Sequence, residues 1–159
     1  MDIDSPIFRR GILLLATWFG CGKSPIAPGT VGTLGALPLV WALAQLPPLS
    51  YMFATLILVV AAIFVSQMHE AITGKHDLGE VVIDEVAGFA VTMTLVPFTW
   101  PYVALGFVIF RILDALKPFP ISYVDRQVKG GIGIVGDDLV AGILSNIILQ
   151  VVLQNRWLA

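Results

Sequence analysis

The charged residues of this 159-residue chain fall into three groups that are separated by long apolar segments. The groups lie within residues 2–23, 70–85 and 111–138, and a further charge, Arg156, follows near the C-terminus. Suppose that the first two apolar segments each cross a membrane an even number of times and that the third crosses it an odd number of times. Every charged residue except Arg156 then faces one aqueous compartment. The pattern therefore predicts an integral membrane protein with one polar face.

The apolar segments also predict individual helices. A helix needs about 20 apolar residues to cross the hydrocarbon core, and prolines at 47–48 and within 96–101 break the first two segments into hairpins. An N-terminal helix over 6–19 is expected at the membrane interface or against the bundle, with a sixth span as the alternative. The predicted fold is a single all-α domain over 1–159, a compact polytopic bundle with about five short transmembrane helices, over 30–45, 51–67, 81–95, 102–113 and 139–153.

Composition supports lipid as the solvent. The chain is 57% hydrophobic and 13% charged, whereas soluble domains are about 45–50% apolar and about 25% charged. A soluble bundle with an unusually apolar core is the alternative. A net charge of −2 without a basic stripe argues against a nucleic-acid partner. All lysines and arginines except Arg156 lie on the charged face, which the positive-inside rule places in the cytoplasm.

Two acidic pairs each precede an apolar segment on this face. Carboxylates near a helix N-terminus are favourable, so helix capping is one explanation. Four carboxylates at one level repel one another unless a cation joins them. Oxygen ligands suit Mg²⁺, which binds carboxylates, water and substrate phosphate. The candidate metal ligands are Asp84, Glu85, Asp137 and Asp138, with His76 and Asp77 as further candidates.

The third charged group combines cations with aspartates. Arg111, Asp114 and Lys117 recur every three residues and can share one side of a helix end. The alternative is that these basic side chains bind no ligand and only extend their charged ends to the membrane surface. Beside two acidic pairs, such cations favour metal-assisted phosphoryl chemistry, because they can bind the phosphate that the metal bridges. The candidate phosphate-binding residues are Arg111, Lys117, Arg126 and Lys129.

Two glycine-containing segments could also hold an anion. Residues 130–136 form either a tight turn with exposed amides or a flexible linker. Residues 20–25 contain the Gly-Lys-Ser of a P-loop, but Thr17 stands where its first glycine belongs. A nucleotide P-loop is therefore excluded, while a loop that carries Lys23 and Thr30 to the polar face remains open.

Several long motifs follow one another between residues 15 and 148. They are PIAPGTVGTL at 25–34, HD at 76–77 with IDEVAG at 83–88, FRILD at 110–114 with KPFP at 117–120, DRQVKGG at 125–131 with GI at 133–134, and DDLVAG at 137–142. Together they resemble the phosphatidylglycerophosphatase A family of bacterial membrane lipid phosphatases.

The resemblance implies Mg²⁺-dependent hydrolysis of phosphatidylglycerophosphate to phosphatidylglycerol and phosphate during phospholipid biosynthesis. It also implies a multi-pass protein of the bacterial inner membrane whose active face is cytoplasmic. The oligomeric state stays open. The candidate catalytic residues are Asp84, Asp114 and Asp137.

Two mechanisms fit these residues. The simpler is attack by a metal-activated water with one carboxylate as the base, and the other forms an aspartyl-phosphate at Asp84 or Asp114. A CDP-alcohol phosphotransferase is a rival activity, but its spaced aspartates on one helix are absent. A small transporter would carry charges at mid-membrane, where the predicted spans carry none.

Overall fold

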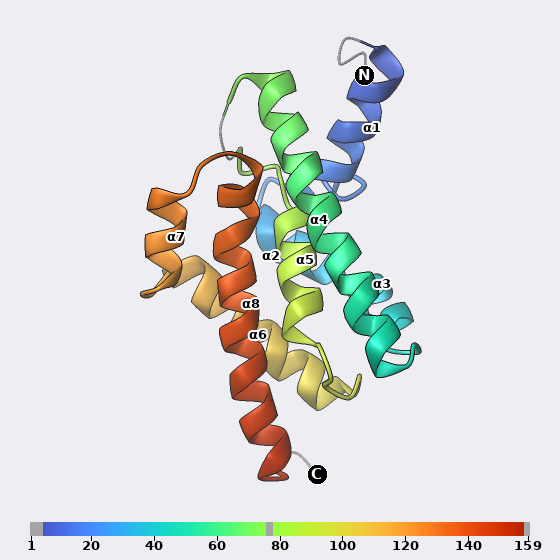
Figure 1. The fold of residues 1–159 in the computed structure, drawn as a ribbon, viewed down its shortest axis with the longest axis vertical. Helices are drawn as coiled ribbons and strands as arrows, with labels where there is room; N and C mark the ends of the chain where they lie inside the picture. Colours follow the sequence, from blue (N-terminus) through green and yellow to red (C-terminus); the bar gives the residue numbers. More distant parts are fainter. Residues whose placement is uncertain (1–4, 76–77, 158–159) are drawn as a thin grey trace.

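The computed structural model describes residues 5–75 and 78–157. Within these residues all regular secondary structure is helical, which confirms the all-α prediction (Figure 1). The elements are α1 (Pro6–Ala16), the 3-10 helix η1 (Cys21–Lys23), α2 (Pro28–Gly35), α3 (Leu37–Leu43), α4 (Pro48–Thr73), α5 (Ile83–Thr92), α6 (Trp100–Leu116), α7 (Ile121–Gln127) and α8 (Gly130–Gln154).

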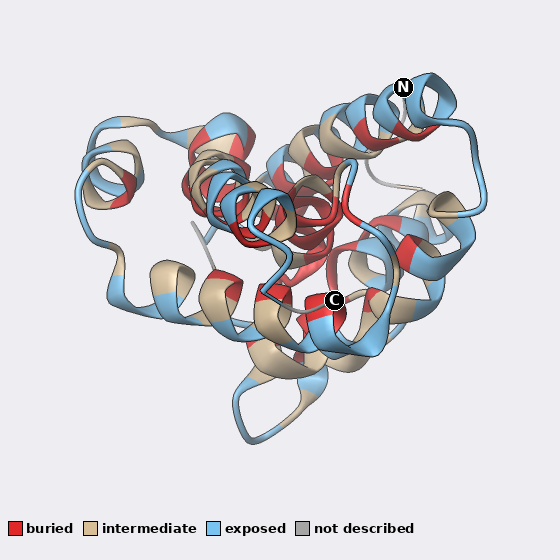
Figure 2. Ribbon diagram, turned by 90° about the horizontal axis from the view of Figure 1, so that it is seen from below, coloured by how far each residue is buried: buried red, intermediate tan, exposed pale blue. Residues whose placement is uncertain are grey.

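Helix α5 lies at the centre of the bundle, packed against α2, α4, α6 and α8. Eight of its ten residues are buried, and its Phe89 side chain packs on Phe107 and Phe110 of α6. Buried residues gather where these helices meet, and the outer faces are exposed (Figure 2). The first acidic pair therefore begins a core helix.

Helices α4 and α8 are the two described helices that are long and apolar enough to cross a membrane. Their 26 and 25 residues correspond to about 39 and 37 Å, which exceeds a hydrocarbon core of about 30 Å. Only 28% of the most apolar window of α4 is buried. Its exposed face carries Phe53, Leu56, Ile57, Val60 and Phe64. A continuous apolar face of this kind indicates a membrane protein.

The arrangement of five spans is not confirmed. The expected helix over 30–45 is divided into α2 and α3, because Pro38 lacks an N–H and its ring would clash with the preceding turn. Helix α5 has ten residues, or about 15 Å, too short to span a bilayer. Its C-terminal end is stabilised inside the bundle by Asn146, whose Nδ2 donates to Thr92 O at 2.9 Å and to Thr94 O at 2.7 Å.

The glycine-rich segment 130–136 is helical, so the expectation of a turn or linker is wrong. Gly131 N donates to Gln67 Oε1 at 2.9 Å, and a Cβ at Gly131 would lie 2.2 Å from Ile63 O. The glycine thus permits close packing of α8 on α4. As a consequence, Asp137 and Asp138 lie two turns inside α8. Capping is therefore wrong as an explanation for this pair.

Helix α1 packs on α4, in agreement with the expectation that the N-terminal helix lies against the bundle. It ends at Ala16, three residues before the predicted end. Trp18 and Phe19 adopt positive φ angles of 43° and 56°, which a right-handed helix cannot contain. The chain then turns through η1 into α2.

Candidate active site

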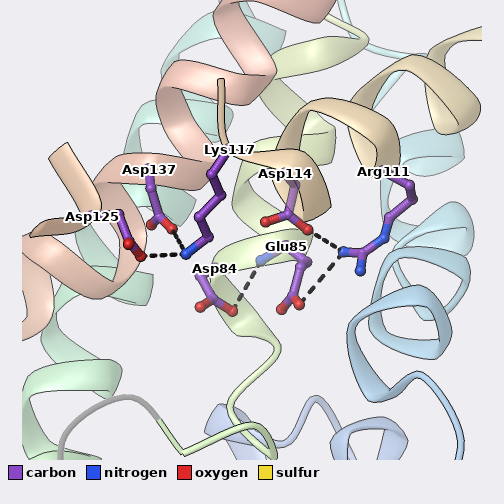
Figure 3. Close-up of polar contacts among 7 residues, drawn as sticks. All are labelled: Asp84, Glu85, Arg111, Asp114, Lys117, Asp125 and Asp137. Carbon is purple, nitrogen blue, oxygen red and sulfur yellow. Dashed lines mark hydrogen bonds and ion pairs between the residues drawn. The ribbon is translucent and has the colours of Figure 1, made fainter. Parts of the chain in front are cut away.

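Helices α5 and α8 bring the two acidic pairs together. Asp84 and Glu85 lie in the first turn of α5, and carboxylate oxygens of Asp84, Glu85 and Asp138 lie within 4.8 Å of one another. Figure 3 shows Asp84 and Glu85 below Asp114 of α6, with Asp137 to one side. Carboxylates from three helices thus share one site.

Close backbone packing of α5 on α8 makes this arrangement possible. A Cβ at Gly88 would lie 2.8 Å from Asp138 O, and a Cβ at Gly142 would lie 2.5 Å from Gly88 O. Small residues allow two helix backbones to approach each other in this way. The crossing lies about one turn from both acidic pairs, so it sets the distance between their carboxylates.

Arg111 connects α6 to the first turn of α5. Its Nη1 lies 2.6 Å from Asp114 Oδ2 and 3.6 Å from Glu85 Oε1. The Arg111–Asp114 pair follows the i, i+3 spacing that the sequence indicated. Figure 3 shows the guanidinium pointing toward both carboxylates. Arg111 therefore places a fixed positive charge at the edge of the acidic cluster.

Lys117 supplies a second cation on the opposite side of the cluster. It is the C-cap of α6, with a φ of 44°, and its Nζ donates to Asp137 Oδ2 at 2.7 Å and to Asp125. Burial alone would lower the pKa of Lys117, but the hydrogen bonds with Asp125 and Asp137 raise it above its usual range. The ammonium group therefore stays charged at neutral pH.

These residues surround a cavity of about 290 Å³. One wall is the start of α2, where Pro28 occupies the first helical position and Gly29 the next. A helix N-terminus attracts anions through its free amides and its dipole. The cavity is lined by Ala27, Pro28, Gly29, Gly79, Val81, Asp84, Glu85, Arg111, Asp114, Lys117, Ile134, Asp137 and Asp138.

The acidic cluster fits a divalent cation. Burial raises the pKa of the Glu85 carboxyl above its usual range; the Asp114 charge adds to this, and Asp84 and Arg111 oppose it. Within the described part of the chain, buried Glu85 Oε2 and Asp138 Oδ1 have no hydrogen-bond partner. Unpaired buried oxygens are costly, and three carboxylates in close proximity are a ligand set that suits Mg²⁺.

The structure brings together one subset of the residues that the sequence singled out. Those that line the cavity are Asp84, Glu85, Arg111, Asp114, Lys117, Asp137 and Asp138. Lys23 is exposed on η1, and Thr30 follows Gly29 without lining the cavity. His76 and Asp77 lie outside the described residues.

Arg126 and Lys129 are not brought to this cavity either. They line a separate cavity of about 320 Å³ together with Glu70, Asp125 and Val128. Helix α7 ends at Gln127, so Lys129 lies beyond it and serves as the N-cap of α8. Arg126 and Lys129 therefore belong to different helices.

The start of α2 is the part of the site that the sequence reasoning missed. The P-loop-like segment indicated that Lys23 and Thr30 could reach the polar face. The cavity is lined instead by Pro28 and Gly29. Proline at the first helical position is a known signal for a helix N-terminus. That signal could have identified this wall of the site.

Similarity to known proteins agrees with this geometry. The family model described as phosphatidylglycerophosphatase A matches residues 14–153. The chain belongs to the phosphatidylglycerophosphatase A family. This membership confirms the resemblance and the expectation of a phosphatase. No solved structure matches the chain at a significant level.

Individual family relatives cover most of the chain. Phosphatidylglycerophosphatase A of Escherichia coli is 43% identical over 145 residues, which cover 91% of this chain and 84% of the relative. Phosphatidylglycerophosphatase A of Haemophilus influenzae is 36% identical over 155 residues, with 94% and 95% covered. A Bacteroides thetaiotaomicron protein, named provisionally as a phosphatidylinositol-3-phosphatase, is also 36% identical over 155 residues, with 91% and 93% covered.

Proposed function

We propose that the chain hydrolyses the terminal phosphomonoester of phosphatidylglycerophosphate, with Mg²⁺, to give phosphatidylglycerol and phosphate in phospholipid biosynthesis. One observation carries the proposal. A carboxylate cluster within 4.8 Å and two cations, Arg111 and Lys117, line the same cavity. Metal-assisted phosphoryl transfer needs these two kinds of group on either side of a phosphate. The names of the relatives from Escherichia coli and Haemophilus influenzae supply the substrate.

Asp84, Glu85 and Asp138 would hold the metal ion. When bound, Mg²⁺ would supply positive charge that draws electrons from the phosphate oxygens. The carboxylate oxygens that lack partners within the described residues, Glu85 Oε2 and Asp138 Oδ1, are the atoms that this role would use.

Arg111, Lys117 and the start of α2 bind the phosphate group. The guanidinium and the ammonium donate charge-assisted hydrogen bonds to its oxygens, and Gly29, in the first turn of α2, lines the same cavity. Both cations are already held by aspartates at 2.6 and 2.7 Å. They are therefore oriented before the substrate enters, which favours stabilisation of charge in the transition state.

Asp137 is suited to be the general base. Its Oδ2 accepts from Lys117 at 2.7 Å, and its buried Oδ1 has no hydrogen-bond partner within the described residues. Oδ1 takes a proton from the attacking water as the new P–O bond forms, and the bond to the glycerol oxygen breaks. The leaving oxygen takes a proton from solvent. Asp114 is a weaker candidate nucleophile, because Arg111 holds it at 2.6 Å.

The cavity is assigned to the cytoplasmic side of the inner membrane. Lys117 and the nearby cations Arg126 and Lys129 lie around the α6–α7–α8 connections. Positive residues remain preferentially on the cytoplasmic side of a bilayer. A lipid made at that surface reaches the cavity without crossing the membrane.

The test measures phosphate release from phosphatidylglycerophosphate by the purified protein, with Mg²⁺ varied. Wild type should require Mg²⁺, and Asp138→Asn should lose at least about 100-fold in kcat/KM, comparable with removing a preorganised electrostatic group. Binding of Mn²⁺, followed by its paramagnetic spectrum, should weaken in the same variant. Glu70→Gln, outside the cavity, serves as the matched control.

Two results would contradict the proposal. Full activity without a divalent ion would show that the reaction does not require a metal. Faster phosphate release from phosphatidylinositol 3-phosphate than from phosphatidylglycerophosphate would show that the proposed substrate is wrong. That result would not contradict the proposed metal site.

A further inference from the structure

An apolar groove lies beside the active-site cavity, between α2–α3 and α6. Its volume is about 260 Å³. One side is formed by Leu34 and Leu37, and the other by the α6 residues Trp100, Ala104, Phe107 and Val108. Figure 1 shows α2 and α6 behind α5, while α4 and α8 lie in front. None of these side chains has a role in the chemistry described above.

The groove continues the cavity along the same two helical walls. Gly29 and Arg111 line the cavity, while Leu34 and Val108 line the groove. Val108 precedes Arg111 by three residues, less than one turn of α6. On α6, the apolar groove and the charged cavity are therefore less than one helical turn apart.

The length of the groove approaches that of one leaflet of a bilayer. Trp100 and Val108, which line its two ends on α6, are eight residues apart, which corresponds to about 12 Å along the helix. Half of a hydrocarbon core of about 30 Å is about 15 Å. A single acyl chain that starts beside the cavity can thus follow the groove to Trp100.

The spacing also leaves room for a polar headgroup. Lys117 lies nine residues beyond Val108, or about 14 Å along the direction of α6. A lipid with a terminal phosphate near Lys117 can place its glycerol units and phosphodiester across this interval. Its first acyl carbons then reach Val108.

We propose that the groove holds one acyl chain of the lipid substrate while its terminal phosphate lies in the cavity. This inference rests on the proposed function, because it concerns the acyl part of the lipid whose terminal phosphate the cavity binds. Moving a chain from bilayer to groove yields little hydrophobic gain, since both surroundings are apolar. The groove therefore acts by positioning: it holds the chain against α6 and directs the headgroup to Arg111 and Lys117.

The first experiment fills the groove and compares two substrates. Ala104 is exposed on α6, so Ala104→Phe can obstruct the groove without entering the core. Because small errors in substrate placement are costly, we expect about a tenfold fall in kcat/KM for phosphatidylglycerophosphate. Deacylated substrate, the same headgroup without acyl chains, should react at the wild-type rate.

Ala61→Phe is the matched control. Ala61 is an exposed alanine on α4 and does not line the groove, so this variant should act on both substrates as the wild type does. Equal losses of Ala104→Phe on the two substrates would show a disturbed active site and overturn the proposal. An unchanged rate on the lipid would overturn it as well.

The second experiment does not depend on hydrolysis. A phosphatidylglycerophosphate analogue with a photoreactive diazirine in one acyl chain should label α6 within 100–108, and Ala104→Phe should abolish that labelling. Labelling spread evenly over the exposed face of α4 would mean bulk lipid contact and would contradict the groove. Groove labelling without phosphate release in wild type would instead contradict the proposed function alone.

Discussion

Gly29 determines how closely the start of α2 approaches the charged residues of the site. A Cβ at this position would lie 2.1 Å from Glu85 Oε1 and 2.9 Å from Arg111 Nη2. The two side chains carry the charges that α5 and α6 contribute on this side of the cavity. A glycine is therefore required here for the geometry of its neighbours.

Gly29→Ala should reduce activity without unfolding the protein. Its methyl group must displace Glu85 and Arg111, and small displacements of positioning groups can cost up to about 100-fold in rate. Alanine also favours helix over glycine by about 1 kcal/mol, which offsets part of any destabilisation. We expect at least a tenfold loss of kcat/KM with a small change in the melting temperature.

Gly11→Ala provides the comparison for Gly29→Ala. A Cβ at Gly11, in α1, would meet no atom within 4 Å. This variant should gain about 0.5–1 kcal/mol in unfolding free energy and retain full activity. Wild-type kcat/KM in Gly29→Ala would disprove the steric argument.

The residues that could be predicted from the sequence are those placed by the helix repeat alone. Arg111 and Asp114 are one turn apart on α6 and lie on one side of it as expected, where they form an ion pair. Arg126 and Lys129 depend instead on the direction in which the chain leaves the turn at Pro118–Pro120. The spacing of residues in the sequence does not indicate that direction. The sequence therefore did not predict the separate cavity that Arg126 and Lys129 line.

At the scale of helices, the crossing of α5 and α8 controls the metal site. Gly88 and Gly142 meet at backbone distance, and the acidic pairs lie near that contact. Both glycines lie within segments that the sequence predicts as helices, 81–95 and 139–153. The sequence did not indicate that α8 begins at Gly130, because a glycine-rich segment resembles a turn until its packing partner on α4 is known.

Gly142→Ala should weaken metal binding from a distance. Its Cβ would lie 2.5 Å from Gly88 O, a backbone atom that can yield only if the helices separate. Asp138 then moves away from Asp84 and Glu85. We expect weaker Mn²⁺ binding and a loss of about 1–3 kcal/mol in unfolding free energy, typical of overpacking.

Gly136→Ala is the control on the same helix. Its Cβ would lie 3.0 Å from Val124 Cγ1, a side-chain atom that can move. Metal affinity should remain close to that of wild type. An equal loss of Mn²⁺ binding in the two variants would show that the α5–α8 crossing has no special role.

At the scale of the molecule, composition indicated the helical membrane class but not the number of spans. Helix α5 is apolar because eight of its ten residues are buried by other helices. Helix α4 is apolar because much of its surface is exposed and suits lipid. Both kinds of segment give the same hydropathy in the sequence. Only the length and burial of each helix distinguish them.

The two long helices lead to a prediction of topology. Helix α8 is about 37 Å long, so its two ends should lie on opposite sides of the bilayer. Tyr123 is exposed on α7, just before α8, and Asn155 is exposed just after it. Lys117, Arg126 and Lys129 lie near the α7 end, so we expect that end to lie in the cytoplasm.

Single cysteines at these two positions, in a Cys21→Ser background, allow a direct measurement. A membrane-impermeant maleimide added to intact spheroplasts should label Asn155→Cys, and it should label Tyr123→Cys only after the membrane is opened. The active-site cavity would then face the cytoplasm together with α7. Labelling of both cysteines from the same side would mean that α8 does not cross the bilayer. In that event α8 would be a core helix, and the exposed face of α4 would lie along the membrane surface instead.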